Sequence, residues 1–299
     1  MAPPLELGEI RDVITAQFPE FAGLEVTRYG AGWDHYLFGV GDEWIVRFPQ
    51  RDECVEPLRR EIAVLSVVSE ALGSRAPRFE RVGAPGRASP YPFVAYRRLV
   101  GIGADQVRSE NRSALARDVG LVLEELHRID PRGLPDPSVV SRRSSWGSLR
   151  STLVARAELA RPLIPDELRE VVEPYLAGQV REPPEDGPHR FIHGDVCPDH
   201  VIVDPLTDRL VGLIDFTDTA VDEIVLDFVG LIGIGGYGFI NEAAQHYGLG
   251  RGPSFEYKLQ WLARTLSLLW LVEAVLDEPR DVPKHVGWVA SAFASWPSR

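Results

Sequence analysis

The sequence predicts an α+β protein of two lobes, with a β-rich amino-terminal lobe and a mostly helical carboxyl-terminal lobe. Short apolar alternations with glycine-containing turns occupy residues 25–49, whereas apolar residues at spacings of three and four dominate beyond residue 104. The change of pattern near residue 100 divides the chain into residues 1–97 and 98–299. With 299 residues, 44% of them hydrophobic, the chain is long enough for one large core or two smaller ones.

The amino-terminal lobe is expected to contain several strands and one helix. A turn at Gly30–Gly32 separates short strands, and WIVRFP (44–49) alternates in the two-residue period of a half-buried strand. Residues 54–72 place apolar side chains at helical spacing and predict an amphipathic helix. Residues 91–101 predict a further strand that runs into a connector between the lobes.

The carboxyl-terminal lobe is expected to be helical around one pair of strands. Residues 191–218 predict two short hydrophobic strands around a turn at Pro205–Asp208, after a proline-rich loop at 181–189. The expected helices cover residues 109–128, 146–161, 165–177, 222–232, 237–247, 254–277 and 283–296.

The charge of the chain limits its partners. Thirty-two basic and 44 acidic side chains give a net charge of −12, which argues against a general nucleic-acid binder and favours a cationic small molecule. Cys54 and Cys197 are the only cysteines, too few and too far apart for a zinc framework or a disulfide framework. The only lysines are Lys258 and Lys284, so arginine carries nearly all of the positive charge.

No segment of the sequence reads as a membrane or export signal. No stretch approaches the roughly 20 uninterrupted apolar residues that a membrane-spanning helix needs. The first residues lack a basic segment followed by an apolar one. We therefore expect a cytoplasmic protein with free thiols that does not bind a membrane.

The segment HGDVCPDH carries the strongest chemical signal. His193, Asp195 and His200 lie in it, and IDFTD, which contains Asp215, begins fourteen residues after His200. Asp195 is suited to accept a proton from a hydroxyl nucleophile, while an ionised Asp215 and a neutral His200 offer oxygen and nitrogen ligands to a metal ion. This order matches the catalytic and magnesium-binding loops of kinases.

Other interpretations of these residues are possible. A single HGD is common, and a single aspartate after an apolar run is usually a turn or a helix cap. A metal hydrolase also uses histidine and aspartate, but the HExxH helix spacing is missing. His193, Asp195, His200 and Asp215 taken together as an ordered set therefore favour phosphoryl transfer, although none of them indicates it alone.

The stretch FIHGDVCPDHVIVD…LVGLIDFTDTAVDEIVLDFVGL resembles the signature of the antibiotic phosphotransferases, a kinase-like family of aminoglycoside and macrolide resistance enzymes. The resemblance extends over about residues 25–280 and implies a bilobal protein-kinase-like fold. It implies that Asp195 is the catalytic base and that Asp215 and His200 are the Mg²⁺ ligands. Histidine at position 200 is familiar in macrolide kinases and aminoglycoside 2″-kinases, where many relatives have asparagine. His193 would brace the loop.

The amino-terminal lobe is consistent with this resemblance. A kinase needs a cation on a strand for the nucleotide phosphates, paired with a glutamate on the next helix. No lysine is present there, but Arg47 in WIVRFP and Glu61 in RREIAVL have these places. Arginine can hold phosphates with two hydrogen bonds, although a surface arginine on an edge strand is the simpler alternative. By resemblance, arginine at this position favours the macrolide kinases.

Two further elements are assigned to the nucleotide. Gly30 and Gly32 would let the backbone approach phosphates, although an ordinary hairpin turn explains a glycine pair equally well. The backbone from Arg97 to Leu99 would hydrogen-bond the purine if this connector is the hinge. The resemblance implies GTP as the phosphate donor, with ATP as the alternative.

The acceptor is expected to bind among the carboxyl-terminal helices, opposite Asp195. Apolar residues at helical spacing are usually core, and acidic residues at a helix start usually serve as caps, so this assignment has alternatives. The candidate acceptor residues are Asp218, Tyr237, Phe239, Trp270 and Glu273.

Taken together, these observations predict a monomer that transfers the γ-phosphate of GTP or ATP to the 2′-hydroxyl of a macrolide amino sugar. Its partners would be a nucleoside triphosphate with Mg²⁺ and a cationic antibiotic. The alternatives are an aminoglycoside 2″-kinase, another kinase for sugars or choline, and, in a different class, a nucleotide-binding pseudokinase.

Overall fold

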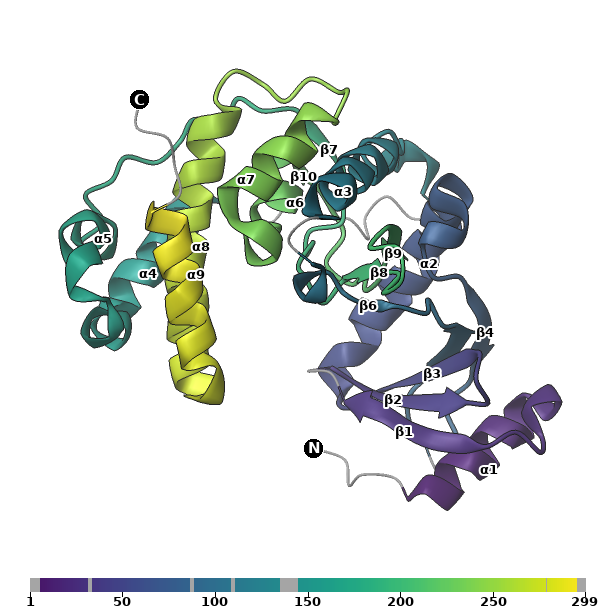
Figure 1. Ribbon diagram of the computed structural model, residues 1–299. Coiled ribbons are helices and arrows are strands. Elements are labelled where there is room, and N and C mark those ends of the chain that lie inside the picture. Colours follow the sequence, from purple (N-terminus) through teal and green to yellow (C-terminus); the bar gives the residue numbers. More distant parts are fainter. Residues whose placement is uncertain are drawn as a thin grey trace.

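The computed structural model describes residues 6–31, 34–86, 89–108, 111–134, 145–277 and 279–294. They form a β-rich amino-terminal lobe and a helical carboxyl-terminal lobe, joined by the connector at 98–101 (Figure 1). The predicted α+β class and order of the two lobes are confirmed.

The amino-terminal lobe is one antiparallel sheet with a different environment on each face. Its strand order is β1-β2-β3-β5-β4, in which the strands are β1 (Val26–Ala31), β2 (His35–Val40), β3 (Trp44–Pro49), β4 (Phe79–Gly83) and β5 (Phe93–Arg97). Phe38, Val46 and Phe93 point to one face and pack there against Ile10 and Ile14 of α1 (Leu7–Gln17). Because side chains alternate along a strand, Arg47 of β3 points to the opposite face, toward α2 (Val55–Leu72).

Two elements of this lobe have no counterpart in the sequence prediction. Helix α1 buries only Ile10 and Ile14, so its apolar period is short, and a capping box between Glu6 and Glu9 marks its start. Strand β4 contains a glutamate and an arginine within five residues and is half-exposed, which hides the strand alternation.

Helix α2 connects the two cores. Its residues Val64, Leu65, Val68 and Leu72 are buried with the carboxyl-terminal helices and not with the cluster under α1. The division into residues 1–97 and 98–299 thus remains a prediction, since one helix of the first part contributes to the core of the second.

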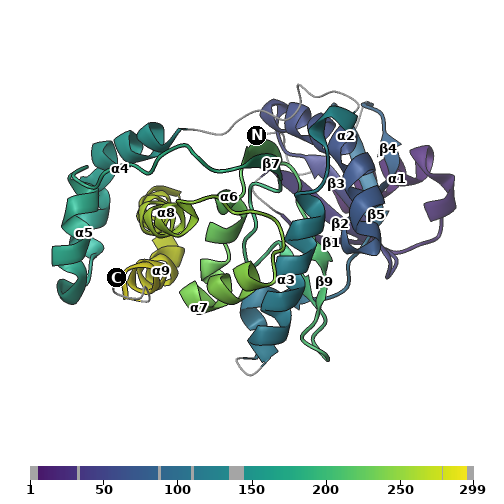
Figure 2. The same ribbon diagram turned by 90° about the horizontal axis from the view of Figure 1, so that it is seen from above.

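The carboxyl-terminal lobe packs around one long apolar helix. Its helices are α3 (Arg112–Leu126), α4 (Trp146–Ala160), α5 (Arg169–Leu176), α6 (Val225–Val229), α7 (Ile232–Gln245), α8 (Phe255–Asp277) and α9 (Val282–Ala294). Helix α8 lies between α4, α6 and α9 (Figure 2). It is long and apolar enough to cross a membrane, but 61% of its most apolar window is buried inside the fold, as in a core helix.

Two small sheets hold the loops between the lobes. Strand β7 (His189–Ile192) pairs with β10 (Ala220–Glu223), and β8 (Val201–Val203) lies between β6 (Ile102–Gly103) and β9 (Leu210–Leu213). The β8–β9 hairpin turns at residues 205–208, as predicted. The helix expected at 222–232 was wrong at its start, because the β10 backbone pairs with β7 and helix begins only at Val225.

Candidate active site

The two small sheets bring both polar segments of the sequence together. The loop 193–200 leaves β7 and enters β8, and the segment 214–219 leaves β9 and enters β10. Since β7 pairs with β10 and β8 with β9, the two segments start and end side by side. His200 and Ile214 are joined directly by a backbone hydrogen bond of 3.0 Å.

Asp195, His200 and Asp215 converge at this place. Nδ1 of His200 lies 2.9 Å from the carbonyl oxygen of Asp195 and 3.3 Å from its carboxylate Oδ2. Nε2 of His200 lies 3.8 Å from Oδ2 of Asp215. The Asp195 and Asp215 side chains are 46% and 42% exposed, whereas His200 is mostly buried between them. Both carboxylates are thus accessible to ligands.

The charges around Asp215 keep it ionised. Burial disfavours its charge, but Arg47, His200 and a hydrogen bond from Thr217 outweigh burial and lower the pKa of Asp215 to about 2. For His200, burial opposes the charge, yet a hydrogen bond with Cys197 and the charges of Cys197, Asp215 and Asp195 raise the pKa to about 10. A neutral His200 therefore requires a bound cation that replaces its proton.

The donor set fits Mg²⁺ at Asp215. Mg²⁺ prefers carboxylate oxygens and keeps several water ligands, and the Asp215 carboxylate is ionised and accessible. His200 Nε2, at 3.8 Å from Asp215 Oδ2, could complete the site. The two predicted metal ligands are thus adjacent in the structure, with Asp215 the stronger candidate.

Asp227 holds the loop 193–200 from inside the fold. This fully buried carboxylate accepts hydrogen bonds from the backbone N–H groups of His193 at 2.8 Å and Gly194 at 2.7 Å. Burial raises its pKa, but hydrogen bonding and charge from His127 and the backbone bond from Gly194 lower it further than burial raises it. Asp227 therefore anchors the loop before Asp195.

His193 fixes the same loop on its other side. Its Nε2–H donates to the carbonyl oxygen of Ile214 at 3.0 Å, and its Nδ1 accepts from the N–H of Asp195 at 3.2 Å. Burial lowers the pKa of His193, which agrees with this neutral pattern of one donor and one acceptor. The expected bracing role of His193 is consistent with these contacts.

Sequence reasoning missed two residues that support Asp227. His127, the residue after α3, donates from Nε2 to Asp227 at 2.9 Å, and the hydroxyl of Tyr247 lies 2.9 Å from its Nδ1. The side chains of Tyr247, His127 and Asp227 form a buried row from the segment after α7 to the loop 193–200. A histidine that directly follows the apolar face of α3 was the one available signal.

Position 194 of this loop accommodates only glycine. Its φ is +85°, and an added Cβ would lie 2.2 Å from the backbone oxygen of Asp218. A side chain would therefore be strained and would also push Asp218 away. Glycine at this position thus lets the loop 193–200 and the segment 214–219 approach each other.

Arg47 of β3 and Glu61 of α2 form a buried ion pair. Arg47 is 6% exposed and Glu61 only 1%, and a hydrogen bond joins Arg47 Nη2 to Glu61 Oε2. Glu61 also accepts from the N–H of Phe216 at 3.2 Å. The arginine is therefore not a surface residue on an edge strand. Its Nε has no hydrogen-bond partner among the described residues, which leaves a donor for a phosphate oxygen.

Thr217 links this ion pair to Asp215. Its hydroxyl lies 2.6 Å from Asp215 Oδ1 and 3.3 Å from Glu61 Oε2. A hydroxyl has a single proton, and Thr217 donates it to Asp215, the nearer of the two carboxylates. Thr217 therefore orients Asp215. Only Phe216–Thr219 separate Asp215 from β10.

The comparison with known proteins agrees with this geometry. The protein-family model described as the phosphotransferase enzyme family matches residues 25–263. The chain belongs to this phosphotransferase family. A homoserine kinase of Granulibacter bethesdensis is 32% identical to it over 109 residues. That match covers 36% of this chain, which thus spans only about a third (32%) of the curated relative's length.

Solved structures show the same kinase-like fold for this phosphotransferase. The GDP complex of wild-type aminoglycoside 2′-phosphotransferase-IIIa has a TM-score of 0.74 at 22% identity, with 97% of this chain and 99% of that chain covered. A macrolide 2′-phosphotransferase from Brachybacterium faecium has a TM-score of 0.61 at 19% identity, with coverage of 98% and 99%. At such identities these likenesses concern the fold alone.

The residues predicted to contact the nucleotide lie on the connector and on strand β1 of the phosphotransferase. The Arg97 side chain pairs with Glu43 and lies 4.6 Å from the ring centre of Trp44. Trp44 packs on the face of the sheet that carries α1, opposite to Arg47. Leu99 lies against Gly212 of β9. Any contact of the connector with a purine would therefore come from its backbone, as expected. Gly30 lies at an irregularity of β1 with open space around it, and Gly32 is outside the described residues.

A cavity of about 430 Å³ opens beside the Asp195 carboxylate. Apolar side chains from α4, α6 and α8 line most of it. Its lining comprises Leu149, Gly194, Asp195, Val196, Cys197, Leu226, Val229, Gly230, Leu266 and Trp270. Of the predicted acceptor residues, Trp270 lies in it.

An acidic cavity of about 510 Å³ adjoins the first across the Trp270 ring. It holds carboxylates from α8 and the catalytic loop, including the predicted Glu273, whose pKa is raised chiefly by burial. Its lining comprises Arg156, Asp199, Trp270, Glu273, Ala274, Asp277, Asp281, Lys284, His285 and Trp288.

Three predicted acceptor residues lie outside both cavities. Phe239 is 4% exposed in the core, because its helical face packs inward. The Tyr237 hydroxyl donates to Glu256 at 3.2 Å. Asp218 is exposed beside Gly194 but does not line either cavity.

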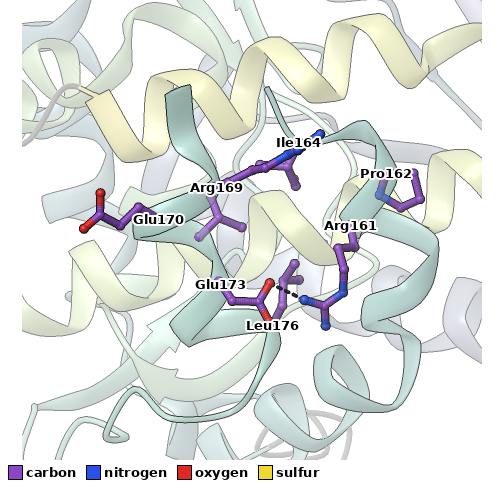
Figure 3. A pocket seen from close by; sticks show the side chains of 8 residues that line it. Arg161, Pro162, Ile164, Arg169, Glu170, Glu173 and Leu176 are labelled. Atoms are coloured by element: carbon purple, nitrogen blue, oxygen red, sulfur yellow. Dashed lines mark hydrogen bonds and ion pairs between the residues drawn. The ribbon is translucent and has the colours of Figure 1, made fainter. Parts of the chain in front are cut away.

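A third cavity of about 500 Å³ lies between the end of α4 and α5, at the end of the molecule far from the amino-terminal lobe (Figures 2 and 3). Arg161 points to Glu173, and Ile164, Val172 and Leu176 are among the apolar residues that line the cavity. None of the residues that converge at Asp195 contributes to this cavity.

Proposed function

We propose that this phosphotransferase moves the γ-phosphate of a nucleoside triphosphate to the hydroxyl of a cationic small molecule. The observation that carries this proposal is the convergence of Asp195, His200 and Asp215 beneath the Arg47–Glu61 pair. A non-catalytic nucleotide-binding protein has no use for an accessible base beside an acceptor cavity, which argues against a pseudokinase.

Each residue has a separate part in the reaction. Arg47 holds phosphate oxygens, and Glu61 keeps the arginine in place. Asp195 orients the acceptor hydroxyl and takes its proton as the bond to phosphorus forms. Bound at Asp215 and His200, Mg²⁺ would neutralise the charge on the nucleotide phosphates.

A macrolide is the acceptor that the cavity beside Asp195 favours. Apart from Asp195, its lining carries no charged side chain, and aliphatic side chains with Trp270 form its walls. A large apolar molecule with a single amino sugar matches this surface, and its 2′-hydroxyl would face Asp195.

An aminoglycoside is the second candidate, supported by the acidic cavity. Asp199, Glu273, Asp277 and Asp281 outnumber Arg156 and Lys284 there, and Trp270 and Trp288 offer rings to a cation. Several ammonium groups would fit this set. The fold is also more similar to the aminoglycoside enzyme than to the macrolide enzyme.

GTP is the proposed donor and the cytoplasm the proposed location. Three of the structural relatives are described as GDP complexes and one as ADP-bound, a balance that supports a guanine nucleotide. Cys54 and Cys197 are both free, in agreement with a reducing compartment. A monomer remains our expectation.

The test is an acceptor panel with purified protein, Mg²⁺ and either GTP or ATP. Macrolides, aminoglycosides and the small metabolites homoserine and choline are offered separately, and each is weighed for the gain of one phosphoryl group. We expect a gain on macrolides with GTP. A gain on aminoglycosides alone would assign the acidic cavity as the binding site, and a gain on homoserine or choline would exclude both antibiotics.

Thr217→Val should raise the Mg²⁺ concentration needed for half-maximal transfer by about 10-fold or more. The substitution keeps the shape but removes the hydrogen bond to Asp215, and bonds to charged groups contribute about 1.5–3 kcal/mol. The rate is measured across a Mg²⁺ titration. Thr217→Ser, which keeps the hydroxyl, is the matched control and should behave as wild type. Equal behaviour of the valine and serine variants would exclude the orienting role.

A further inference from the structure

Cys197 adds a soft donor to the catalytic loop that the transfer reaction does not use. The ligating atoms of Asp195, Cys197 and His200 all lie within 4.8 Å of one another. Cys197 is partly exposed and forms no disulfide. Carboxylate oxygen, thiol sulfur and imidazole nitrogen are the three donor types that zinc uses in proteins, whereas Mg²⁺ takes oxygen.

The spacing of these donors suits a tetrahedral cation. Nδ1 of His200 and Oδ2 of Asp195 are 3.3 Å apart. Two ligands at bond lengths of about 2.0–2.1 Å in a tetrahedral site are separated by about 3.3 Å. Nε2 of the same ring faces Asp215 instead. The two sides of His200 thus face two different groups of ligands.

We propose that Asp195, Cys197 and His200 form a second metal site, which binds a thiophilic divalent cation such as Zn²⁺ or Cd²⁺ and inhibits phosphoryl transfer when occupied. Three protein ligands leave one tetrahedral position for water. Nδ1–H of His200 donates to the carbonyl oxygen of Asp195 in the free protein, so the metal replaces this proton as well as the thiol proton, and both pass to solvent. A single cysteine is sufficient at this site because histidine and aspartate supply the other ligands. The number and spacing of the cysteines alone therefore do not reveal the site.

Inhibition follows from the second role of Asp195. A carboxylate that holds Zn²⁺ cannot at the same time accept the proton of an acceptor hydroxyl. This consequence rests on the proposed function, whereas the binding of the cation does not. The two can therefore be tested apart.

Binding is tested by titrating the full-length protein with Cd²⁺, without nucleotide or Mg²⁺, and recording the thiolate-to-cadmium charge-transfer band in the ultraviolet. We expect one equivalent to bind to wild type and to Cys54→Ala, the matched control at the only other cysteine. Cys197→Ser should lose the band and weaken Zn²⁺ binding at least about 10-fold, since even outer partners of metal ligands contribute 10- to 100-fold. Thermal unfolding confirms that each variant is folded.

Asp195→Asn provides a second variant that keeps the thiol. It should retain the band but require at least about 10-fold more Cd²⁺ to reach it. A full-strength band in Cys197→Ser, loss of the band in Cys54→Ala, or wild-type affinity in Asp195→Asn would each overturn the proposed site.

Inhibition is then measured as the ratio of rates with and without Zn²⁺ at saturating Mg²⁺, for each variant against its own uninhibited rate. Wild type and Cys54→Ala should lose activity about 10-fold or more in Zn²⁺ concentrations that leave Cys197→Ser within about twofold of its own rate. Equal inhibition of all three would mean that Zn²⁺ acts at Asp215, and would overturn the inhibitory role. Absence of any transfer without Zn²⁺ would contradict the proposed function and leave the cadmium result intact.

Discussion

Replacing Asp195 by asparagine is expected to lower the rate of phosphoryl transfer by about 10²- to 10⁴-fold, the range that a positioned general base contributes. Asparagine has the same shape but cannot take the proton of the acceptor hydroxyl. Nucleotide affinity should be unchanged, because Arg47 and Asp215 remain. The measurements are kcat with the best acceptor of the panel and the Kd of GDP by calorimetry.

The fold of the Asp195→Asn variant should also be unchanged. The side chain is 46% exposed, and its mostly buried neighbour His200 keeps the hydrogen bond from Nδ1 to the carbonyl oxygen of residue 195. Asp204→Asn, in the β8–β9 turn, is a control that makes the same change of charge on a neighbouring loop. A loss below about tenfold for Asp195→Asn would place the base elsewhere, since even a weak general base contributes more.

Asp227→Ala should destabilise the protein by about 3–5 kcal/mol, because loss of one partner from a buried charged network leaves the others uncompensated. Three buried donors would lose their acceptor: the N–H groups of His193 and Gly194 and Nε2 of His127. The free energy of unfolding is measured by urea denaturation at neutral pH. Transfer activity should fall together with stability, since the loop before Asp195 loses its support.

A graded series tests whether Asp227 acts as this anchor. Tyr247→Phe removes only the far end of the row and should cost about 1 kcal/mol, and Asp227→Asn, which keeps one acceptor oxygen, about 1–3 kcal/mol. Asp227→Ala should be the most costly of the three. If it is no more costly than Tyr247→Phe, the buried row does not hold the loop.

The contribution of Asp227 should also depend on pH in a definite direction. Its pKa in the folded protein is lowered, so its stabilising effect is fully present above the unfolded value of about 4. The effect is lost as the pH falls through the lower folded value. The difference in stability between wild type and Asp227→Asn should therefore shrink only in acid.

The convergence of Asp195, His200 and Asp215 could be predicted from sequence because these residues lie in short contiguous motifs. Asp195, His200 and Asp215 fall within 21 residues, and short strands on either side leave their ends at one edge. The Arg47–Glu61 pair was predictable because each residue sits in a clear strand or helix pattern and the first lobe lacks lysine.

The supporting and acceptor residues could not be predicted in this way. His127, directly after α3, and Asp227, in α6, are 100 residues apart in sequence and meet only in the folded carboxyl-terminal lobe. Phe239 and Trp270 both lie on apolar helices, and helical spacing does not reveal which one faces a cavity and which one the core. Strand β10 was missed because its sequence, AVDE, suits a helix start until β7 offers its backbone as a partner.

The short connection between Asp215 and β10 has a consequence for control. In protein kinases, the segment that follows the magnesium-binding aspartate contains the site whose phosphorylation turns the enzyme on. Here four residues, Phe216–Thr219, fill that interval, and Glu61 already contacts Phe216 and Arg47. There is no segment at this point on which a switch could be built. We therefore expect the protein to work from the moment it folds, so that a cell adjusts its output through gene expression and protein turnover.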